Sequence, residues 1–341
     1  MTPNVNDLQT PALILDSGAL EANLATMAAL LPGERCRPHV KAHKTTSLAQ
    51  RQSAHGHLGF TCATPREVIG MAKAGLGGDL LLANESVDPV RLTAMALLVE
   101  QEHARITVAV DSIETVNAAA DAGLREVLID VDVGLPRCGV PPEGAGAVAD
   151  AARSRGLTVR GVMGYEGHVV GLASHEDRLR LTEEAMKLLL KAHGDVGGEI
   201  ISAGGTGTYA INTWANEIQA GSYALMDTAY SALGLPFIQA LKVIATVVSV
   251  SPKGWAVCDV GLKSLGMDHG NPSVEGGDVF FCSDEHTTIL PHEGVRLKVG
   301  DRVRLTPAHI DPTVAYHDKM YLTEAGGDSI IETWAVDLRG W

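Results

Sequence analysis

The sequence predicts an α/β protein with a (β/α)8 TIM-type barrel followed by a mostly antiparallel β domain. Over the first two-thirds of the chain, apolar runs of about 4–6 residues alternate with helical patterns of about 10–20 residues, which is typical of βαβ units in a parallel sheet. About eight or nine such units precede residue 230, which favours a closed barrel over the alternative, an open doubly wound sheet. After residue 236 the pattern changes to alternating or β-branched runs separated by turns.

The barrel strands are expected where short apolar runs end at polar residues or glycine, at residues 12–15, 36–40, 58–62, 80–83, 106–110, 127–131, 159–163, 200–203 and 218–226. The helices between them are expected at residues 20–31, 46–54, 65–74, 89–100, 113–122, 144–155 and 176–192. Ser17 is placed to cap the first of these helices, and Pro65 suits the first turn of the third.

Six short strands are expected in the C-terminal region, at residues 243–250, 255–259, 279–282, 287–290, 303–306 and 330–334. We therefore expect residues 1–235 to form the barrel and residues 236–341 to form the β domain, with the boundary at Gly234 to Pro236. The first residues of the chain can instead join the β domain.

The composition excludes several classes of partner and location. The 341 residues carry a formal net charge of −14, which argues against nucleic acid or an anionic membrane as a partner. No window of about 18 uncharged apolar residues predicts a transmembrane helix, and the polar N-terminus lacks the pattern of a signal peptide. Five widely spaced cysteines without a CxxC pair predict neither a disulfide framework nor a cysteine zinc site, so we expect a cytoplasmic protein.

Lys41 is the first candidate for chemistry, because it stands where an expected strand ends and a loop begins. Arg37 and Lys44 add positive charge around it. Like charge and burial both lower the pKa of a lysine, which makes its amine a nucleophile able to form a Schiff base. The alternative is a basic loop that binds an anion or water.

A glycine-rich loop at residues 202–208 follows another expected strand. Its residues Gly205, Thr206 and Gly207 can present backbone N–H groups and a hydroxyl to a phosphate group. The loop lacks the lysine of a P-loop, and its alternative role is a tight turn between a strand and a helix. A lysine amine and a phosphate grip together indicate pyridoxal 5′-phosphate as the cofactor.

His309 and Asp311 are candidates for a metal site in the β domain. On an extended segment, residues two apart point to the same face, where an imidazole and a carboxylate can hold a divalent ion. This pair of ligands leaves Mn²⁺, Mg²⁺ and Zn²⁺ open. The alternative is a surface pair in a turn.

Four further side chains are candidates at the mouth of the expected barrel. Arg137 is placed to face a cofactor ring or a substrate carboxylate, or to be an ordinary surface arginine. Tyr165 can contact an aromatic ring, and His168 is a candidate general base or else a structural histidine. Tyr223 would bring a hydroxyl to the mouth of the barrel.

These motifs together resemble the D-threonine aldolase and D-serine dehydratase family, which are fold-type III pyridoxal phosphate enzymes related to alanine racemase. The resemblance covers nearly the whole chain, and its motifs occur in the family's order at residues 10–13, 37–44, 204–208, 309–314 and 317–318. It implies an alanine racemase-like barrel, a following β domain and a metal-dependent site. It also implies a homodimer.

The resemblance implies a role for each matching position: Lys41 as the Schiff-base lysine; Gly205, Thr206, Gly207 and Tyr223 around the phosphate; Tyr165 and Arg137 near the pyridine ring; and His309 and Asp311 on the metal. Dehydratases of the family typically carry His-x-Cys at the metal site, whereas aldolases carry His-x-Asp. The presence of Asp311 therefore favours an aldolase.

The expected reaction is retro-aldol cleavage of a D-3-hydroxy amino acid, such as D-threonine, to glycine and an aldehyde. The metal would lower the pKa of the β-hydroxyl, and His168 or a metal-bound water would remove its proton. A dehydratase that acts on D-serine or a related D-3-hydroxy amino acid, giving a keto acid and ammonia, is the alternative. A racemase is a weaker alternative, and a non-catalytic pyridoxal phosphate carrier is a remote one because such carriers lack a second domain.

Overall fold

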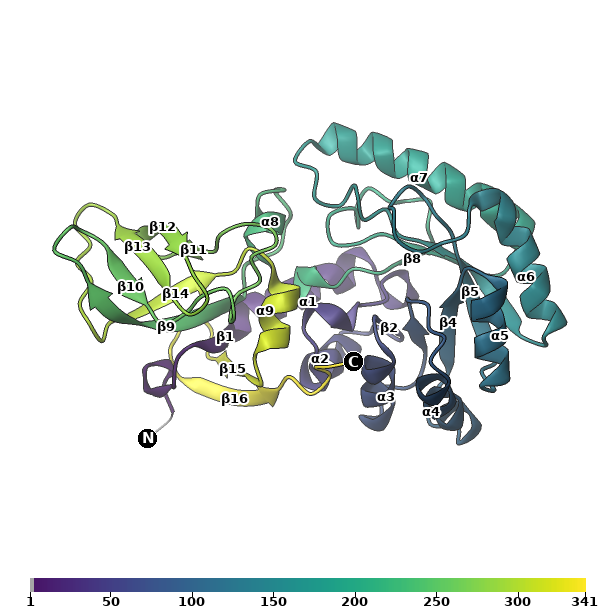
Figure 1. Cartoon of the computed structure of the whole chain (residues 1–341), viewed down its shortest axis with the longest axis horizontal. Helices are drawn as coiled ribbons and strands as arrows, with labels where there is room; N and C mark the ends of the chain where they lie inside the picture. Colours follow the sequence, from purple (N-terminus) through teal and green to yellow (C-terminus); the bar gives the residue numbers. More distant parts are fainter. Residues whose placement is uncertain (1–2) are drawn as a thin grey trace. The chain divides into compact units, whose positions relative to one another are not determined.

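The computed structural model describes residues 3–341, and the chain divides into two compact units (Figure 1). We call the first the β unit. It comprises the N-terminal segment that ends at Thr26, together with Ala42–Ser47 and Ser222–Asp337. We call the second the barrel unit; it comprises Met27–Lys41, Leu48–Gly221 and Leu338–Trp341. Among the described residues, no helix combines the length and the apolar character needed to cross a membrane.

Seven parallel strands of the barrel unit pair in the order in which they occur along the chain: β2 (Phe60–Cys62), β3 (Leu80–Leu82), β4 (Ile106–Val110), β5 (Glu126–Asp130), β6 (Thr158–Gly164), β7 (Ile200–Ala203) and β8 (Glu217–Ile218). Residues 36–39 lie between β8 and β2 and close the ring, because Cys36 pairs with Ile218 and His39 pairs with Thr61, both in parallel. The expected eight-membered (β/α) barrel is therefore confirmed.

The helices of the barrel unit lie outside the ring of strands (Figure 1): α3 (Pro65–Lys73), α4 (Pro89–Glu100), α5 (Ile113–Asp121), α6 (Ala145–Ser154) and α7 (His175–Val196). Thr64, Asp88, Ser112 and Ser174 each accept a backbone N–H of the helix that follows, which satisfies donors that the first turn would leave unpaired. Pro65 occupies the first turn of α3, as expected. One apolar residue from each of five successive strands packs into a common buried cluster: Leu81, Ala109, Leu128, Met163 and Ile200.

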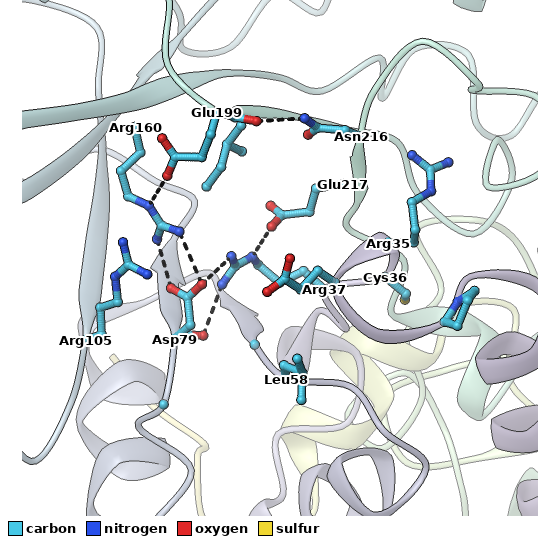
Figure 2. Close-up of a pocket in the computed structure, with 15 residues that line it drawn as sticks. Arg35, Cys36, Arg37, Leu58, Asp79, Arg105, Arg160, Glu199, Asn216 and Glu217 are labelled. Carbon is cyan, nitrogen blue, oxygen red and sulfur yellow. Dashed lines mark hydrogen bonds and ion pairs between the residues drawn. The ribbon is translucent and has the colours of Figure 1, made fainter.

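An ion-pair network lies at the amino ends of the barrel strands, beside a cavity of about 940 Å³ (Figure 2). Asp79, the residue before β3, receives Nη2 of Arg37 at 2.8 Å and Nη1 of Arg160 at 2.9 Å. Arg37 also binds Glu217, and Arg160 also binds Glu199. The expected positive charge of Arg37 beside Lys41 is therefore balanced by two carboxylates at the amino end of the barrel.

We expect Asp79→Ala to reduce the free energy of unfolding by about 2–3 kcal/mol at pH 7, because it removes the partly buried carboxylate that the buried Arg37 and Arg160 share. Burial alone would raise the pKa of Asp79, but the hydrogen bonds and charges of Arg37 and then Arg160 outweigh it and lower the pKa. The ionised Asp79 therefore stabilises the fold fully above about pH 4, which is the pKa of an aspartate in the unfolded chain. This contribution is lost as the pH falls through the lowered pKa of the folded state.

Urea unfolding measured from pH 7 toward pH 3 checks this expectation, since the difference between the variant and the wild type should shrink with acid. Asp150→Ala is the matched control, because the Asp150 side chain is 84% exposed and its pair with Arg153 contributes little. An Asp79→Ala protein as stable as the control at pH 7 would contradict a stabilising network.

The β unit contains a nine-stranded sheet, whose strands in chain order are β1 (Ala12–Asp16), β9 (Leu241–Val250), β10 (Ala256–Cys258), β11 (Ser273–Val274), β12 (Gly277–Cys282), β13 (Thr287–Pro291), β14 (Arg302–Thr306), β15 (Lys319–Thr323) and β16 (Ile330–Ala335). Strands β9 to β14 form a closed ring, because β10 pairs with both β13 and β9. All their pairings are antiparallel, which confirms the expected mostly antiparallel β domain.

Strand β1 belongs to the β unit rather than to the barrel, where a strand at residues 12–15 was expected to begin the βα series. It pairs antiparallel with β9 and parallel with β15. Ile14 packs with Val5, Ile244 and Ile330 in a buried cluster of this unit. An apolar run predicts a buried strand, but it carries no information about which sheet will pair with it.

Three local boundaries also differ from the expectations. Helix α1 (Ser17–Leu30) is capped by Asp16, whose Oδ1 accepts the N–H of Ala19 at 2.7 Å, so Ser17 is the first helical residue rather than the cap. The strand expected at residues 218–226 ends at Ile218. The chain enters the β unit at Ser222 rather than at the expected boundary of residues 234–236.

Candidate active site

Lys41 lies in a short 3-10 turn, η3 (Val40–Ala42), directly after the segment that closes the barrel. Its side chain is half-buried, and its backbone N–H donates to Nδ1 of His39 at 3.4 Å. Because all eight members of the barrel run parallel, Lys41 lies at the same end as the loops that follow β5, β6 and β7. This carboxyl end is where barrel enzymes carry their chemistry.

The glycine-rich loop after β7 is held by Glu166, a completely buried residue. Its carboxylate accepts the N–H of Gly204 at 3.0 Å, the hydroxyl of Thr208 at 2.9 Å and the amide of Asn212 at 3.0 Å. The N–H of Gly205 donates to Oγ1 of Thr208 at 3.2 Å. The backbone N–H groups of Gly204 and Gly205 therefore stabilise the conformation of the loop itself. The sequence analysis assigned no role to Glu166.

Two glycines of this loop are required by backbone geometry. Gly204 has a φ of +80°, in the left-handed region that favours glycine. A Cβ on Gly207 would lie 1.8 Å from the carbonyl oxygen of Val170, so no larger residue fits there. The tight-turn explanation and the phosphate-binding explanation of these glycines are therefore compatible.

Arg137, Tyr165 and His168 gather near the glycine loop within the barrel unit. The guanidinium carbon of Arg137 lies 5.5 Å from the ring centroid of Tyr165. A Cβ built on Gly205 would lie 3.4 Å from the edge of the same ring, so the ring packs against the loop. The imidazole of His168 packs over Gly134, three residues before Arg137.

A pair of acidic residues lies in the same part of the barrel unit and had no role in the sequence analysis. Burial raises the pKa of Asp130 well above its usual range, and the neighbouring carboxylate of Glu85 raises it further. The charge of Arg137 acts in the opposite direction. Asp130 is the last residue of β5, where sequence alone did not distinguish a buried acid from an exposed one.

The residues at this end of the barrel fit pyridoxal phosphate. They supply a half-buried amine, a glycine loop shaped for close approach, and an aromatic ring with an adjacent guanidinium. Such a set can bond a carbonyl carbon, receive a phosphate and pack beside a flat heterocycle.

His309 and Asp311 of the β unit approach each other, with Nε2 of His309 lying 3.9 Å from Oδ1 of Asp311. The reason differs from the expected one, because the segment is not extended throughout. His309 is the last extended residue, and Asp311 lies in the first turn of α9 (Ile310–Tyr316). Two ligands that each stand about 2.1 Å from one ion cannot be more than about 4.2 Å apart, and the pair lies within that limit. An imidazole with a carboxylate suits a divalent transition metal.

Asp227 holds the backbone between His309 and Asp311 in place. It is completely buried; its Oδ2 accepts the N–H of Ile310 at 3.2 Å and its Oδ1 accepts the N–H of Tyr230 at 2.9 Å. Burial raises the pKa of Asp227, and these two backbone hydrogen bonds oppose the rise. The carboxyl group therefore connects the start of α9 to the start of α8 (Thr228–Ser231).

Asp268, His269 and His309 each place a potential metal-ligating atom within 4.8 Å of the other two. The sequence analysis assigned no role to Asp268 or His269. Tyr223, the last of the expected site residues, also belongs to the β unit. It is completely buried, and its ring lies 5.6 Å from that of Phe237. Lys41, Arg137, Tyr165, His168 and the glycine loop belong to the barrel unit.

Comparisons with known proteins extend over nearly the whole chain. The family model described as alanine racemase, N-terminal domain, matches residues 15–229, and that described as putative serine dehydratase domain matches residues 240–323. A 3-hydroxy-D-aspartate aldolase of Paracoccus denitrificans (strain Pd 1222) is 35% identical, and a D-threonine aldolase of an Arthrobacter species is 33% identical. Each alignment covers 98% of this chain and 93% of the relative.

Solved structures give the same result. The crystal structure of a D-threonine aldolase from Filomicrobium marinum matches with a TM-score of 0.93 and 32% identity, covering 100% of this chain and 98% of the other. A D-threo-3-hydroxyaspartate dehydratase from Delftia sp. HT23 matches with a TM-score of 0.88 and 26% identity, covering 99% of this chain and 100% of the other.

Proposed function

This chain belongs to the family that joins an alanine racemase-type N-terminal domain to a serine dehydratase-type domain and that includes D-threonine and 3-hydroxy-D-aspartate aldolases, and we propose that it acts as such an aldolase. It is a carbon–carbon lyase that cleaves D-3-hydroxy amino acids to glycine and an aldehyde. The reaction uses pyridoxal phosphate and a divalent metal, for which manganese, magnesium and zinc are candidates and manganese is the first to test. The homodimer and the cytoplasmic location remain predictions.

The proposed roles follow from the chemistry of each side chain. When bound, pyridoxal phosphate accepts electron density from the substrate as its Cα–Cβ bond breaks. Lys41 holds the cofactor covalently, and residues 205–207 bind its phosphate. Arg137 and Tyr165, which lie 5.5 Å apart as guanidinium carbon and ring centroid, support the cofactor ring. Tyr223 is proposed as a further phosphate contact.

In the β unit, His309 and Asp311 are proposed to hold the metal ion, which orients the substrate β-hydroxyl. A divalent ion held there would supply positive charge, which lowers the pKa of a bound hydroxyl. His168, in the barrel unit, is proposed as a general base of the reaction. The β-oxygen then becomes the carbonyl oxygen of the aldehyde product, and Cα gains a proton to give glycine.

The observation that carries the choice of aldolase is that a carboxylate rather than a thiol lies beside His309, with Oδ1 of Asp311 3.9 Å from Nε2. A hard carboxylate ligand suits an ion that must bind and retain an oxygen of the substrate. The dehydratase alternative is supported by the structural likeness to a D-threo-3-hydroxyaspartate dehydratase.

A product assay separates the two reactions. We expect D-threonine and D-3-hydroxyaspartate to yield glycine and an aldehyde in equal amounts, with turnover lost when a chelator removes the metal. L-threonine is the matched control and should give no product. Keto acid and ammonia as the main products would instead establish the dehydratase, and absence of turnover with cofactor and metal bound would favour a carrier.

A further inference from the structure

The imidazole of His309 has a carboxylate on each of its two sides. Its Nε2 lies 3.9 Å from Asp311, as described above. Its Nδ1 lies 2.8 Å and 3.0 Å from the two carboxylate oxygens of Asp268. An ionised carboxylate can only accept a hydrogen bond, so Nδ1 carries the proton and donates to Asp268. In this tautomer the lone pair of the ring is on Nε2, the nitrogen nearer to Asp311.

The carboxylate of Asp268 is held in this position by its backbone. Gly266 pairs antiparallel with His309. The hydroxyl of Thr313 accepts the N–H of Gly266 at 2.8 Å and donates to the carbonyl of His309 at 2.7 Å. A Cβ on Gly266 would lie 2.7 Å from that same carbonyl, so the two segments touch without room for a side chain. The segment that carries Asp268 is therefore hydrogen-bonded to the segment that carries His309.

His269 limits tilting of the His309 imidazole. Its imidazole stacks on that of His309 with 4.0 Å between centroids and 9° between planes. Its Nε2 lies 3.8 Å from a carboxylate oxygen of Asp268. Asp268 thus sets the tautomer and the direction of the His309 ring, and His269 covers one of its faces.

The exposure of Asp268 argues against a mainly structural role. Its side chain is 57% exposed, and hydrogen bonds of exposed groups contribute little to the stability of a fold. By contrast, a carboxylate that accepts the second N–H of a metal-binding histidine fixes the ring and increases its basicity, and loss of such a partner typically weakens metal binding.

We propose that Asp268 is a positioning residue for the metal ligand His309, holding the Nε2 lone pair toward the ion that His309 and Asp311 share. The inference rests on the proposed function, because it takes these two residues as the ligands. The proposal places Asp268 outside the coordination sphere, because its oxygens lie against Nδ1 whereas Asp311 lies on the side of Nε2. Asp268, His269 and His309 could themselves surround an ion, and the Asp268→Asn variant separates this alternative.

Binding of Mn²⁺ to the pyridoxal phosphate-loaded protein tests the proposal, with free Mn²⁺ measured by electron paramagnetic resonance. We expect Asp268→Ala to raise the Kd for Mn²⁺ by about 10–100-fold. Asp268→Asn should keep most of the affinity, within about threefold of the wild type, because its amide oxygen can still accept from Nδ1. Asp278→Ala is the matched control, since Asp278 also lies beside a histidine, His292, at 3.3 Å in the same unit.

Two results would overturn the proposal. If Asp268→Asn weakens Mn²⁺ binding as much as Asp268→Ala, the carboxylate acts as a ligand or through its charge rather than as a hydrogen-bond acceptor. If both variants bind as the wild type does, Asp268 has no part in the site. His309→Ala in the same assay separates these results from a failure of the proposed function: unchanged Mn²⁺ binding there would remove the metal assignment itself.

Discussion

Lys41→Ala is expected to lower the rate of cleavage by at least about 10³-fold, because it removes the only group proposed to bond the cofactor covalently. The variant should also lose the visible absorption band of bound pyridoxal phosphate. Borohydride reduction of the wild type should label one peptide, the one that contains Lys41. The position of this lysine at the carboxyl end of the barrel supports the expectation.

Lys73→Ala is the matched control for this experiment. Lys73 is an exposed lysine on α3 of the same unit, and its loss should leave the absorption band, the labelled peptide and the rate unchanged. A yellow, active Lys41→Ala protein would show that the cofactor is attached elsewhere.

His309→Ala is expected to have the second largest effect, a loss of activity on the order of 10³-fold, because the metal supplies several kcal/mol of charge stabilisation to the reaction. The absorption band of the cofactor should remain, since His309 belongs to the β unit and is not proposed to touch pyridoxal phosphate. Chelator should reduce the wild type to the level of the variant and should have no further effect on the variant.

His292→Ala serves as the control, because His292 is an exposed histidine beside an aspartate in the same unit. A His309→Ala protein that is active and still inhibited by chelator would mean that the essential ion binds at other residues. Together with Lys41→Ala, this variant separates a failure of the cofactor assignment from a failure of the metal assignment.

The barrel could be predicted from the sequence because most of its strands are short apolar runs followed by helical patterns. Eight of the nine expected strands, those from residue 36 onward, correspond to the eight members of the ring. The ninth, at residues 12–15, is apolar in the same way, yet it pairs with β9 and β15. Local hydrophobicity predicts burial, whereas strand pairing depends on which edge is free when the chain collapses.

The site was predictable to the extent that one residue type carries the chemistry. A lysine after a strand, a glycine loop after another and a His-x-Asp pair each have an ordinary structural explanation when taken alone, and only their combination indicated a cofactor and metal site. Glu166 and Asp268 gave no such signal, because each acts on a partner that lies about 40 positions away along the chain. The expectation that Arg37 adds positive charge around Lys41 failed for the same reason. The carboxylates that neutralise Arg37, those of Asp79 and Glu217, are 42 and 180 residues away along the chain.

Sequence alone was therefore sufficient for the kind of fold and for the family of enzymes, and it provided the residue assignments that the proposed experiments test. Folding in three dimensions determined the partners of those residues: the carboxylate that holds the glycine loop, the helical turn that brings Asp311 to His309, and the aspartate that fixes the His309 tautomer. The physical reason is that the residue type determines which bonds a side chain can form. Which hydrogen bonds and ion pairs it does form depends on distances of about 3 Å that the packing of distant segments creates.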